Sequence, residues 1–471
     1  MTTGLARVTI SAPERRVDVA LPEHVPLAEL LPELLRHAGE GLADDGERHG
    51  GWVLRRTDGT ALSGGQGLAA QGVRDGEILH LVAARAQWPE LEYDDVVEAI
   101  AEGARRRGVG WTGAHTRITA IVAAGLGLAV ALIAVLRAGP DSTPAMFVAL
   151  GIAATLTLAG VIAARAYGDP LAGTALAAYS LPYAFVAGAL LVATGDPTGP
   201  VPGVAWIGAP ELLLGSAAVL LHGVLGIVGV GAGRRVFAGA VTAGLLGALS
   251  ALGGFVLSAG GVAAILVAVL VCGIGLLPLL AIRFGKLPMP PVTLPTGPAA
   301  AEGFTAAPSG YDAARERPDR AAVFAAVGRT EEWLTGMLLG HAVLATVAAV
   351  VLVEAGGLAG RVLVAVAAVA LLLRSRLFLT VRQRVPLLAA GLAGASVLGA
   401  WLAMNGGVPA ALAGFLIALV IITAGATYAK RAPGPYLGRA ADLVDTALVV
   451  SVVPVACAVL GLYGRARGLL G

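Results

Sequence analysis

Arginine side chains carry most of the positive charge in this sequence, and their pattern favours binding over catalysis. Lysine occurs only as Lys286 and Lys430 among 33 basic residues. Neither stands in the Gly-Lys-Ser/Thr segment with which a P-loop holds nucleotide phosphates, and HExxH, GxSxG and paired-carboxylate patterns are also missing. We therefore expect no enzymatic activity, no cofactor and no metal site. Energy for any transport would have to come from a partner.

Two arginine groups are candidates for contacts with a partner protein or with lipid headgroups, because guanidinium groups hold carboxylates and phosphates through paired hydrogen bonds. The first group consists of Arg374, Arg376, Arg382 and Arg384, and the second of Arg105, Arg106 and Arg107. For the first group, the alternative is that these charges only set the topology of the flanking spans. A net charge of +2 gives no indication of nucleic-acid binding.

Other ionisable groups are scarce within the apolar segments. His222 and His341 are the two that lie well inside or near a predicted span. We interpret each as packed against a neighbouring helix, since a proton relay would need buried acidic partners. Acidic residues lie instead at span ends, as Glu211, Glu354 and Asp445.

Small residues recur at every fourth position in the segment expected to form the ninth span. This helix-packing stripe consists of Gly391, Ala395, Gly399 and Ala403. Small side chains let helix backbones approach closely in lipid, so we expect the stripe to support packing. Packing within the chain and packing between copies are both open on the sequence alone.

The elements that must position these residues begin with a polar module over residues 1–84. Strands are predicted at residues 5–11, 15–21, 52–54, 60–62 and 77–83. A helix with one apolar stripe is predicted to start at Pro26. This order resembles the ubiquitin-like β-grasp, an α+β fold. The chain has no diglycine end after this module, which favours a fixed docking domain over a conjugated modifier.

The rest of the chain is expected to be an all-α polytopic membrane domain. The sequence is 57% hydrophobic and 14% charged, with a mean hydropathy of +0.80, whereas about a quarter of the residues of a soluble protein are charged. Eleven stretches approach the ~20 apolar residues that a spanning helix needs. The predicted parts are an amphipathic linker helix at 85–117, six spans within 118–282, a cytoplasmic loop at 283–334, five spans within 335–463 and a short external C-terminus at 464–471.

The orientation follows from the basic residues between the spans. With the N-terminus in the cytoplasm, the inner loops carry sixteen arginines and lysines against four on the outer side. The start of the chain also lacks the apolar segment and cleavage site of a signal peptide. We therefore expect a multi-pass protein of the cell (inner) membrane with a cytoplasmic N-terminus and an external, periplasmic C-terminus.

Several segments along the chain resemble EccD, the polytopic subunit of actinobacterial type VII (ESX) secretion systems. They are Tyr93-Asp94-Asp95-Val96-Val97-Glu98-Ala99-Ile100, Leu287-Pro288-Met289-Pro290-Pro291, the basic residues 373–388 and the C-terminal residues 454–469. The resemblance implies a non-enzymatic scaffold that pairs as a homodimer around a lipid-filled vestibule. It also implies that the ubiquitin-like domain docks the FtsK/SpoIIIE-type ATPase EccC, and that EccB and EccE are further partners.

Two other functions remain open at this stage. A stand-alone secondary transporter with a regulatory β-grasp domain would also join such a module to many spans, although matched broken helices in two halves are not evident. A membrane-embedded lipid-processing enzyme would require polar residues clustered at one membrane face, and the sequence shows no such cluster.

Overall fold

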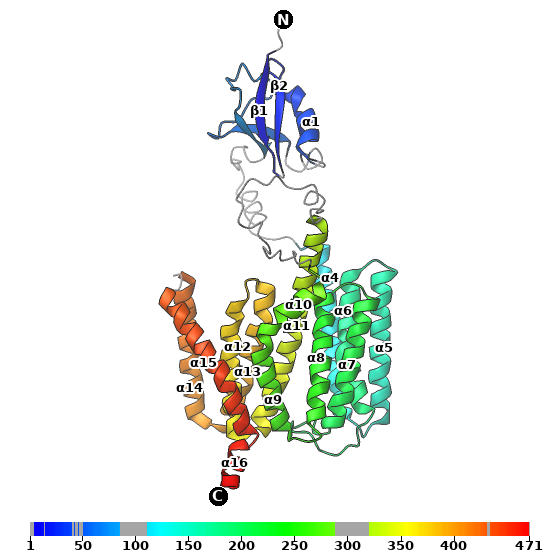
Figure 1. Cartoon of the computed structure of the whole chain (residues 1–471). Helices are drawn as coiled ribbons and strands as arrows, with labels where there is room; N and C mark the ends of the chain where they lie inside the picture. The colour runs from blue at the N-terminus through cyan, green and yellow to red at the C-terminus, as the bar shows by residue number, and fades with distance from the viewer. Residues whose placement is uncertain are drawn as a thin grey trace, which may run out of the picture. The chain divides into compact units, whose positions relative to one another are not determined.

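The computed structural model describes residues 4–13, 15–39, 42, 46, 50–84, 111–287, 320–430 and 434–470. It divides into two compact units, Met1–Thr112 and Gly113–Gly471 (Figure 1). The predicted linker helix, apart from its last residues, lies outside the described residues. The same holds for Arg105, Arg106 and Arg107, and for the prolines that follow Leu287.

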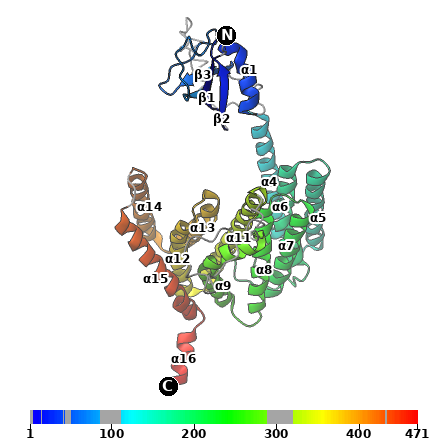
Figure 2. The ribbon, with the colours of Figure 1, turned by 45° about the horizontal axis from the view of Figure 1, so that its top comes forward.

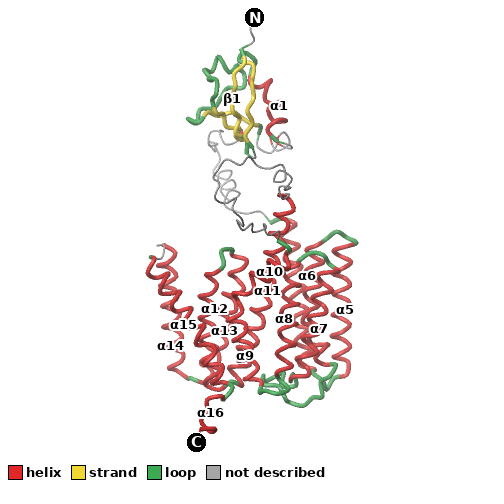
Figure 3. The backbone as a smooth tube through the Cα atoms, in the orientation of Figure 1, coloured by secondary structure: helices red, strands yellow, loops and turns green. Residues whose placement is uncertain are grey.

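The N-terminal unit contains a mixed four-stranded sheet in the order β2-β1-β4-β3 (Figure 3). Its strands are β1 (Leu5–Ser11), β2 (Arg16–Pro22), β3 (Trp52–Arg56) and β4 (Ile78–Ala83). The first strand pairs antiparallel with β2 and parallel with β4, while β3 pairs antiparallel with β4. Together with one helix packed against the sheet, this arrangement confirms the predicted β-grasp class.

The core of this unit lies between the sheet and α1 (Leu27–Ala38). Alternate residues of β1 point inward, so Val8 and Ile10 are buried together with Leu79 of β4. Leucines at helical spacing on α1 face the same core. The buried ones are Leu27, Leu34 and Leu35, and the partly buried ones are Leu30 and Leu31.

The predicted strand at residues 60–62 is wrong, because this segment forms only one isolated bridge, from Ala61 to Arg55. Two backbone hydrogen bonds of 2.8 Å, Arg56 N to Thr60 O and Leu62 N to Leu54 O, close the short turn. A turn at Gly64 and Gly65 follows directly, and the segment pairs no further within the described residues. Within the turn, the backbone N–H of Thr60 donates to Asp58 and holds the pKa of that carboxyl below its usual value.

The second unit contains eleven helices within the described residues that are long and apolar enough to cross a membrane, the number that the sequence predicts. The bounds are α4 (Gly113–Ala138), α5 (Thr143–Arg165), α6 (Pro170–Leu190), α7 (Ala209–Gly229), α8 (Arg234–Gly253), α9 (Ala259–Gly273), η2 (Ile274–Leu276), α10 (Leu277–Gly285), α11 (Arg320–Ala355), α12 (Gly357–Arg374), η4 (Ser375–Leu377), α13 (Val381–Asn405), α14 (Gly407–Lys430), α15 (Pro435–Val459) and α16 (Leu462–Leu470). The sixth span joins α9, η2 and α10, and the eighth joins α12 and η4.

Helices α9 to α13 and α15 share the largest apolar core, which includes Leu338, Leu352, Leu363 and Leu387. Figure 2 labels α9, α11, α12, α13 and α15 among these helices. The earlier helices α4 to α8 form smaller buried clusters. The two groups meet where α8 packs on α11. A Cβ on Gly336 of α11 would lie 2.5 Å from the carbonyl oxygen of Arg235 on α8, so only glycine permits this approach.

Two helices begin well before the apolar spans predicted for them. Helix α11 begins at Arg320 and α15 at Pro435, whereas the corresponding spans were expected at 335–354 and 443–463. The difference arises because apolarity marks the part of a helix inside the hydrocarbon, and the helix itself continues through polar turns. For α15, the added turns carry Asp442, one of the two acidic residues of the candidate site, and Asp445 follows in the next turn.

Candidate functional site

The first arginine group surrounds the connection between α12 and α13. Arg374 ends α12, Arg376 lies in η4, and Arg382 and Arg384 lie in the first turns of α13. The connection is held by Phe378, which is 6% exposed and packs into the large core. The buried ring of Phe378 anchors this connection in the core, and the four arginines lie on the backbone segments at either side of it.

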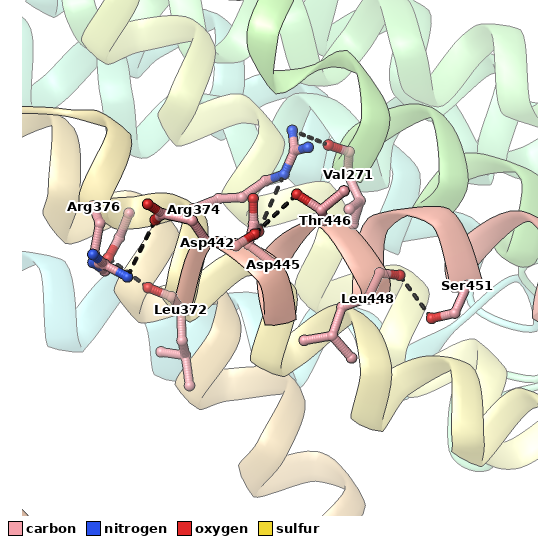
Figure 4. Close-up of polar contacts among 10 residues, drawn as sticks. Val271, Leu372, Arg374, Arg376, Asp442, Asp445, Thr446, Leu448 and Ser451 are labelled. Atoms are coloured by element: carbon pink, nitrogen blue, oxygen red, sulfur yellow. Dashed lines mark hydrogen bonds and ion pairs between the residues drawn. The ribbon is translucent and has the colours of Figure 1, made fainter. Parts of the chain in front are cut away.

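Arg374 is the most enclosed member of the group. Its side chain is 14% exposed, and its Nε lies 3.6 Å from Oδ1 of Asp445, whose side chain is 20% exposed (Figure 4). Its Nη1 also donates a 3.0 Å hydrogen bond to the carbonyl of Val271, near the end of α9. The last carbonyls of an α-helix lack partners within the helix, and Arg374 satisfies one of them. Arg374 therefore joins α12, α9 and α15.

Arg376 and Arg384 also form contacts within the chain. Nη1 of Arg376 lies 3.6 Å from Oδ1 of Asp442, with 44% and 76% of the two side chains exposed. Nε of Arg384 donates a 2.6 Å hydrogen bond to the carbonyl of Phe378. Arg374 and Arg376 therefore bridge helices within the chain, whereas Arg384 holds the connection between α12 and α13. Their predicted contacts with a partner protein or with lipid headgroups stay predictions.

The acidic partners of these arginines were not identified as a pair from the sequence. Asp442 and Asp445 are three residues apart on α15, so they lie on one face of the helix. Asp442 pairs with Arg376, and Asp445 pairs with Arg374 (Figure 4). A signal was present, because two carboxylates at helical spacing precede the apolar part of the last predicted span. Only the fold could show that this face meets the basic loop.

Arg382 is set apart from the other three. It is exposed and lines a separate pocket beside α8 and α11. Among the described residues it has no ion-pair partner. Its predicted role in contacting a partner or a headgroup stays a prediction, and so does that of Arg105, Arg106 and Arg107.

The helix-packing stripe divides between two environments. Gly391 is buried, and a Cβ there would lie 2.8 Å from the carbonyl oxygen of Ala368 on α12. The other three members, Ala395, Gly399 and Ala403, are exposed in the single chain. Gly394 replaces Ala395 on the buried face, because the face that packs within the chain follows spacings of both three and four residues.

The two histidines within spans bond to their own helices. Nδ1 of His222 lies 2.9 Å from the carbonyl oxygen of Ala218, and Nδ1 of His341 lies 2.9 Å from that of Met337. In the part of the chain that the structure describes, no three His, Cys, Asp or Glu side chains are grouped to hold a metal ion.

Two protein families match this chain, and their order along it follows the two units. The family described as "EccD-like transmembrane domain" matches residues 116–469. The family described as "WXG100 protein secretion system (Wss), protein YukD" matches residues 5–81. The second description names a protein secretion system, and neither describes a catalytic domain.

Curated relatives and solved structures share the same layout. The chain is 28% identical to the "ESX-4 secretion system protein eccD4" of Mycobacterium tuberculosis (strain H37Rv) over 99% of this chain and 98% of that protein. It is also 28% identical to the "ESX-3 secretion system protein EccD3" of the same strain, over 98% and 97% of the two chains. A chain of "Structure of protomer 1 of the ESX-3 core complex" has the same fold, with a TM-score of 0.58 and 22% identity over 98% of this chain and 100% of that chain.

A chain of "MycP5-free ESX-5 inner membrane complex, State II" matches less closely, with a TM-score of 0.53 and 19% identity over 91% of this chain and 100% of that chain. At these identities the two structures establish the fold. The family assignment depends instead on the model that covers most of the chain. This chain is therefore a member of the EccD family, the multi-pass membrane proteins of ESX (type VII) secretion, with a YukD-type ubiquitin-like domain at its N-terminus.

Proposed function

We propose that this chain is the non-enzymatic membrane scaffold of an ESX core complex in the inner membrane. The observation that carries the proposal is the union, in one chain, of a ubiquitin-like domain and eleven candidate spans that both match secretion-system families. The relatives that share this layout are named as ESX secretion proteins over nearly their whole length. A chain of the same fold belongs to a complex described as an inner membrane complex.

In the proposed arrangement the N-terminal domain lies in the cytoplasm and the C-terminus on the periplasmic side. The bias of arginines toward the inner loops supports this orientation. The chain works as a homodimer around a lipid-filled vestibule, with EccB, EccC and EccE as partners. Two features favour such an assembly. Nothing in the apolar window of α14 is buried within the single chain, and large side chains such as Phe415 and Ile421 are exposed there.

The proposed role of the ubiquitin-like domain is to dock the FtsK/SpoIIIE-type ATPase EccC. Residues 1–84 contain eight arginines and twelve acidic residues, so the domain offers a partner an acidic surface. Asp18, Glu29 and Asp75 are exposed on it. The chain lacks a P-loop, so the energy for export has to be supplied by such a partner.

Replacing residues 1–84 with an unrelated soluble domain of equal size tests this function. The membrane unit is left unchanged, and its insertion is followed with an antibody against the C-terminal region. We expect normal insertion and loss of export of WXG100-type substrates. Normal export from cells that hold only the replaced chain would refute the docking role, while failure of insertion would be detected by the antibody and would call for point variants of the domain surface.

A further inference from the structure

A pocket between the first turns of α8 and α13 and residues 325–335 of α11 has the composition of an anion site. It has a volume of about 350 Å³ and lies among α8, α11 and α13. Three arginines line it, one from each helix, and the remaining polar lining comes from α11. The polar residues are Arg235, Arg329, Glu331, Glu332, Thr335 and Arg382.

The charges of this pocket are not balanced within the described part of the chain. Glu332 is paired with Arg234, whose Nη1 lies 3.1 Å from its Oε2. Arg235, Arg329 and Arg382 have no such partner among the described residues, which leaves Glu331 as the one unpaired carboxylate of the lining. The net positive charge favours an anion, and guanidinium groups suit phosphate oxygens because they donate parallel hydrogen bonds.

A second observation is an unsatisfied hydroxyl in the wall of the pocket. Thr335 is 5% exposed and lines the pocket, yet its Oγ1 has no hydrogen-bond partner among the described residues. Buried hydroxyls are normally hydrogen-bonded, and an unmade bond costs about 1–3 kcal/mol. The neighbouring Gly336 packs against the carbonyl of Arg235, so this turn of α11 lies beside the first turn of α8.

The helix ends around the pocket add to the positive potential. Both α8 and α13 have arginines and no acidic residue in their first turns, and neither has a side-chain cap. Cations at a helix N-terminus oppose the helix dipole, so an anion bound there would relieve an unfavourable arrangement. The pocket also lies where spans begin, the level of lipid headgroups.

We propose that this pocket binds a phosphate group, the chemistry shared by an anionic phospholipid headgroup and free phosphate. Arg235, Arg329 and Arg382 hold the phosphate oxygens, and the Thr335 hydroxyl, whose oxygen is buried in this structure, turns about χ1 to donate to one of them. Glu331 accepts from a hydroxyl of a polyol headgroup such as that of phosphatidylglycerol. The pocket is distinct from the pairs of Arg374 and Arg376, and the inference does not depend on the scaffold function proposed above.

Native mass spectrometry of the full-length chain in neutral detergent tests the proposal. Dioleoyl phosphatidylglycerol is the lipid probe, dioleoyl phosphatidylcholine is its zwitterionic comparison, and inorganic phosphate is the competitor. The test variant R235Q/R382Q loses two exposed arginines of the pocket. The matched control R283Q/R439Q loses two exposed arginines elsewhere, and T335V removes only the hydroxyl.

We expect R235Q/R382Q to weaken binding of the phosphate probe about tenfold or more and T335V about threefold, while the control stays within about twofold. Phosphatidylglycerol that is retained against millimolar inorganic phosphate assigns the site to a lipid headgroup, whereas displacement assigns it to free phosphate. The proposal is overturned if neither probe depends on Arg235 and Arg382 more than on the control pair.

Discussion

The ion pair between Arg374 and Asp445 gives the sharpest prediction for the membrane unit. Arg374→Leu removes the guanidinium and leaves the Asp445 carboxylate, 20% exposed, without its cation. The Val271 carbonyl loses its donor at the same time. Breaking a buried pair by removing one partner costs about 3–5 kcal/mol, and partial exposure of both side chains reduces this to about 2–3 kcal/mol.

A cost of about 2–3 kcal/mol corresponds to a roughly 30- to 160-fold change in the unfolding equilibrium constant. The double variant R374L/D445L removes both charges, so no buried carboxylate remains unpaired. We expect it to lie within about 1 kcal/mol of the unaltered chain. Arg376→Leu is the matched control, because its pair with Asp442 is largely exposed and is worth at most about 0.5 kcal/mol.

The assay is unfolding of the full-length chain in mixed micelles of increasing denaturing detergent, followed by tryptophan fluorescence. The predicted order of stability is unaltered chain, R376L, R374L/D445L and then R374L. The double-mutant cycle formed by R374L, D445L and R374L/D445L reports the coupling directly. If R374L were no less stable than R376L, or if the double variant lost the sum of the two single effects, the assigned role of the pair would be refuted.

Three further predictions concern other parts of the chain. Gly336→Val should destabilise the contact between α8 and α11 by about 1–3 kcal/mol, because the valine side chain would meet the carbonyl of Arg235. The control in the same unfolding assay is Gly399→Ala, where a Cβ meets no atom within 4 Å. Leu79→Ala, at a side chain that is 0% exposed, should lower the stability of the N-terminal unit by about 2–5 kcal/mol, measured by hydrogen exchange of residues 5–83. Leu5→Ala, 56% exposed, should leave exchange nearly unchanged, and equal effects would contradict the assigned core. In a background with Cys272→Ala and Cys457→Ala, a membrane-impermeant maleimide should label D141C in intact spheroplasts and label Y167C only after lysis; the reverse pattern would invert the proposed orientation.

The class of each unit could be predicted because the patterns that specify it are local. Alternation in β1 and the leucine stripe of α1 follow from the periods of strand and helix. Spanning segments are recognised by apolar length, which gives the number found in the structure. The strand prediction at residues 60–62 was wrong because a short stretch of strand-forming residues next to a turn does not show whether a neighbouring strand has room to pair with it.

The contacts of the basic loop could be predicted only in part. Arginine clustering marked the loop as a place where anions are held. The groups that Arg374 contacts come from distant positions in the sequence. Asp445 supplies a carboxylate, and Val271 supplies a backbone carbonyl that no sequence pattern marks. Arg382 was grouped with its neighbours by sequence, yet in the structure it lines a pocket with residues of α8 and α11.

The scaffold account is tested most directly by recovery of the FtsK/SpoIIIE-type ATPase with this chain from solubilised membranes. The chain is purified through a C-terminal tag, once in full and once with residues 1–84 replaced by the unrelated domain, from membranes that contain equal amounts of each. The account predicts that the ATPase is recovered with the full chain and is lost with the replaced one. Equal recovery with both chains would contradict it.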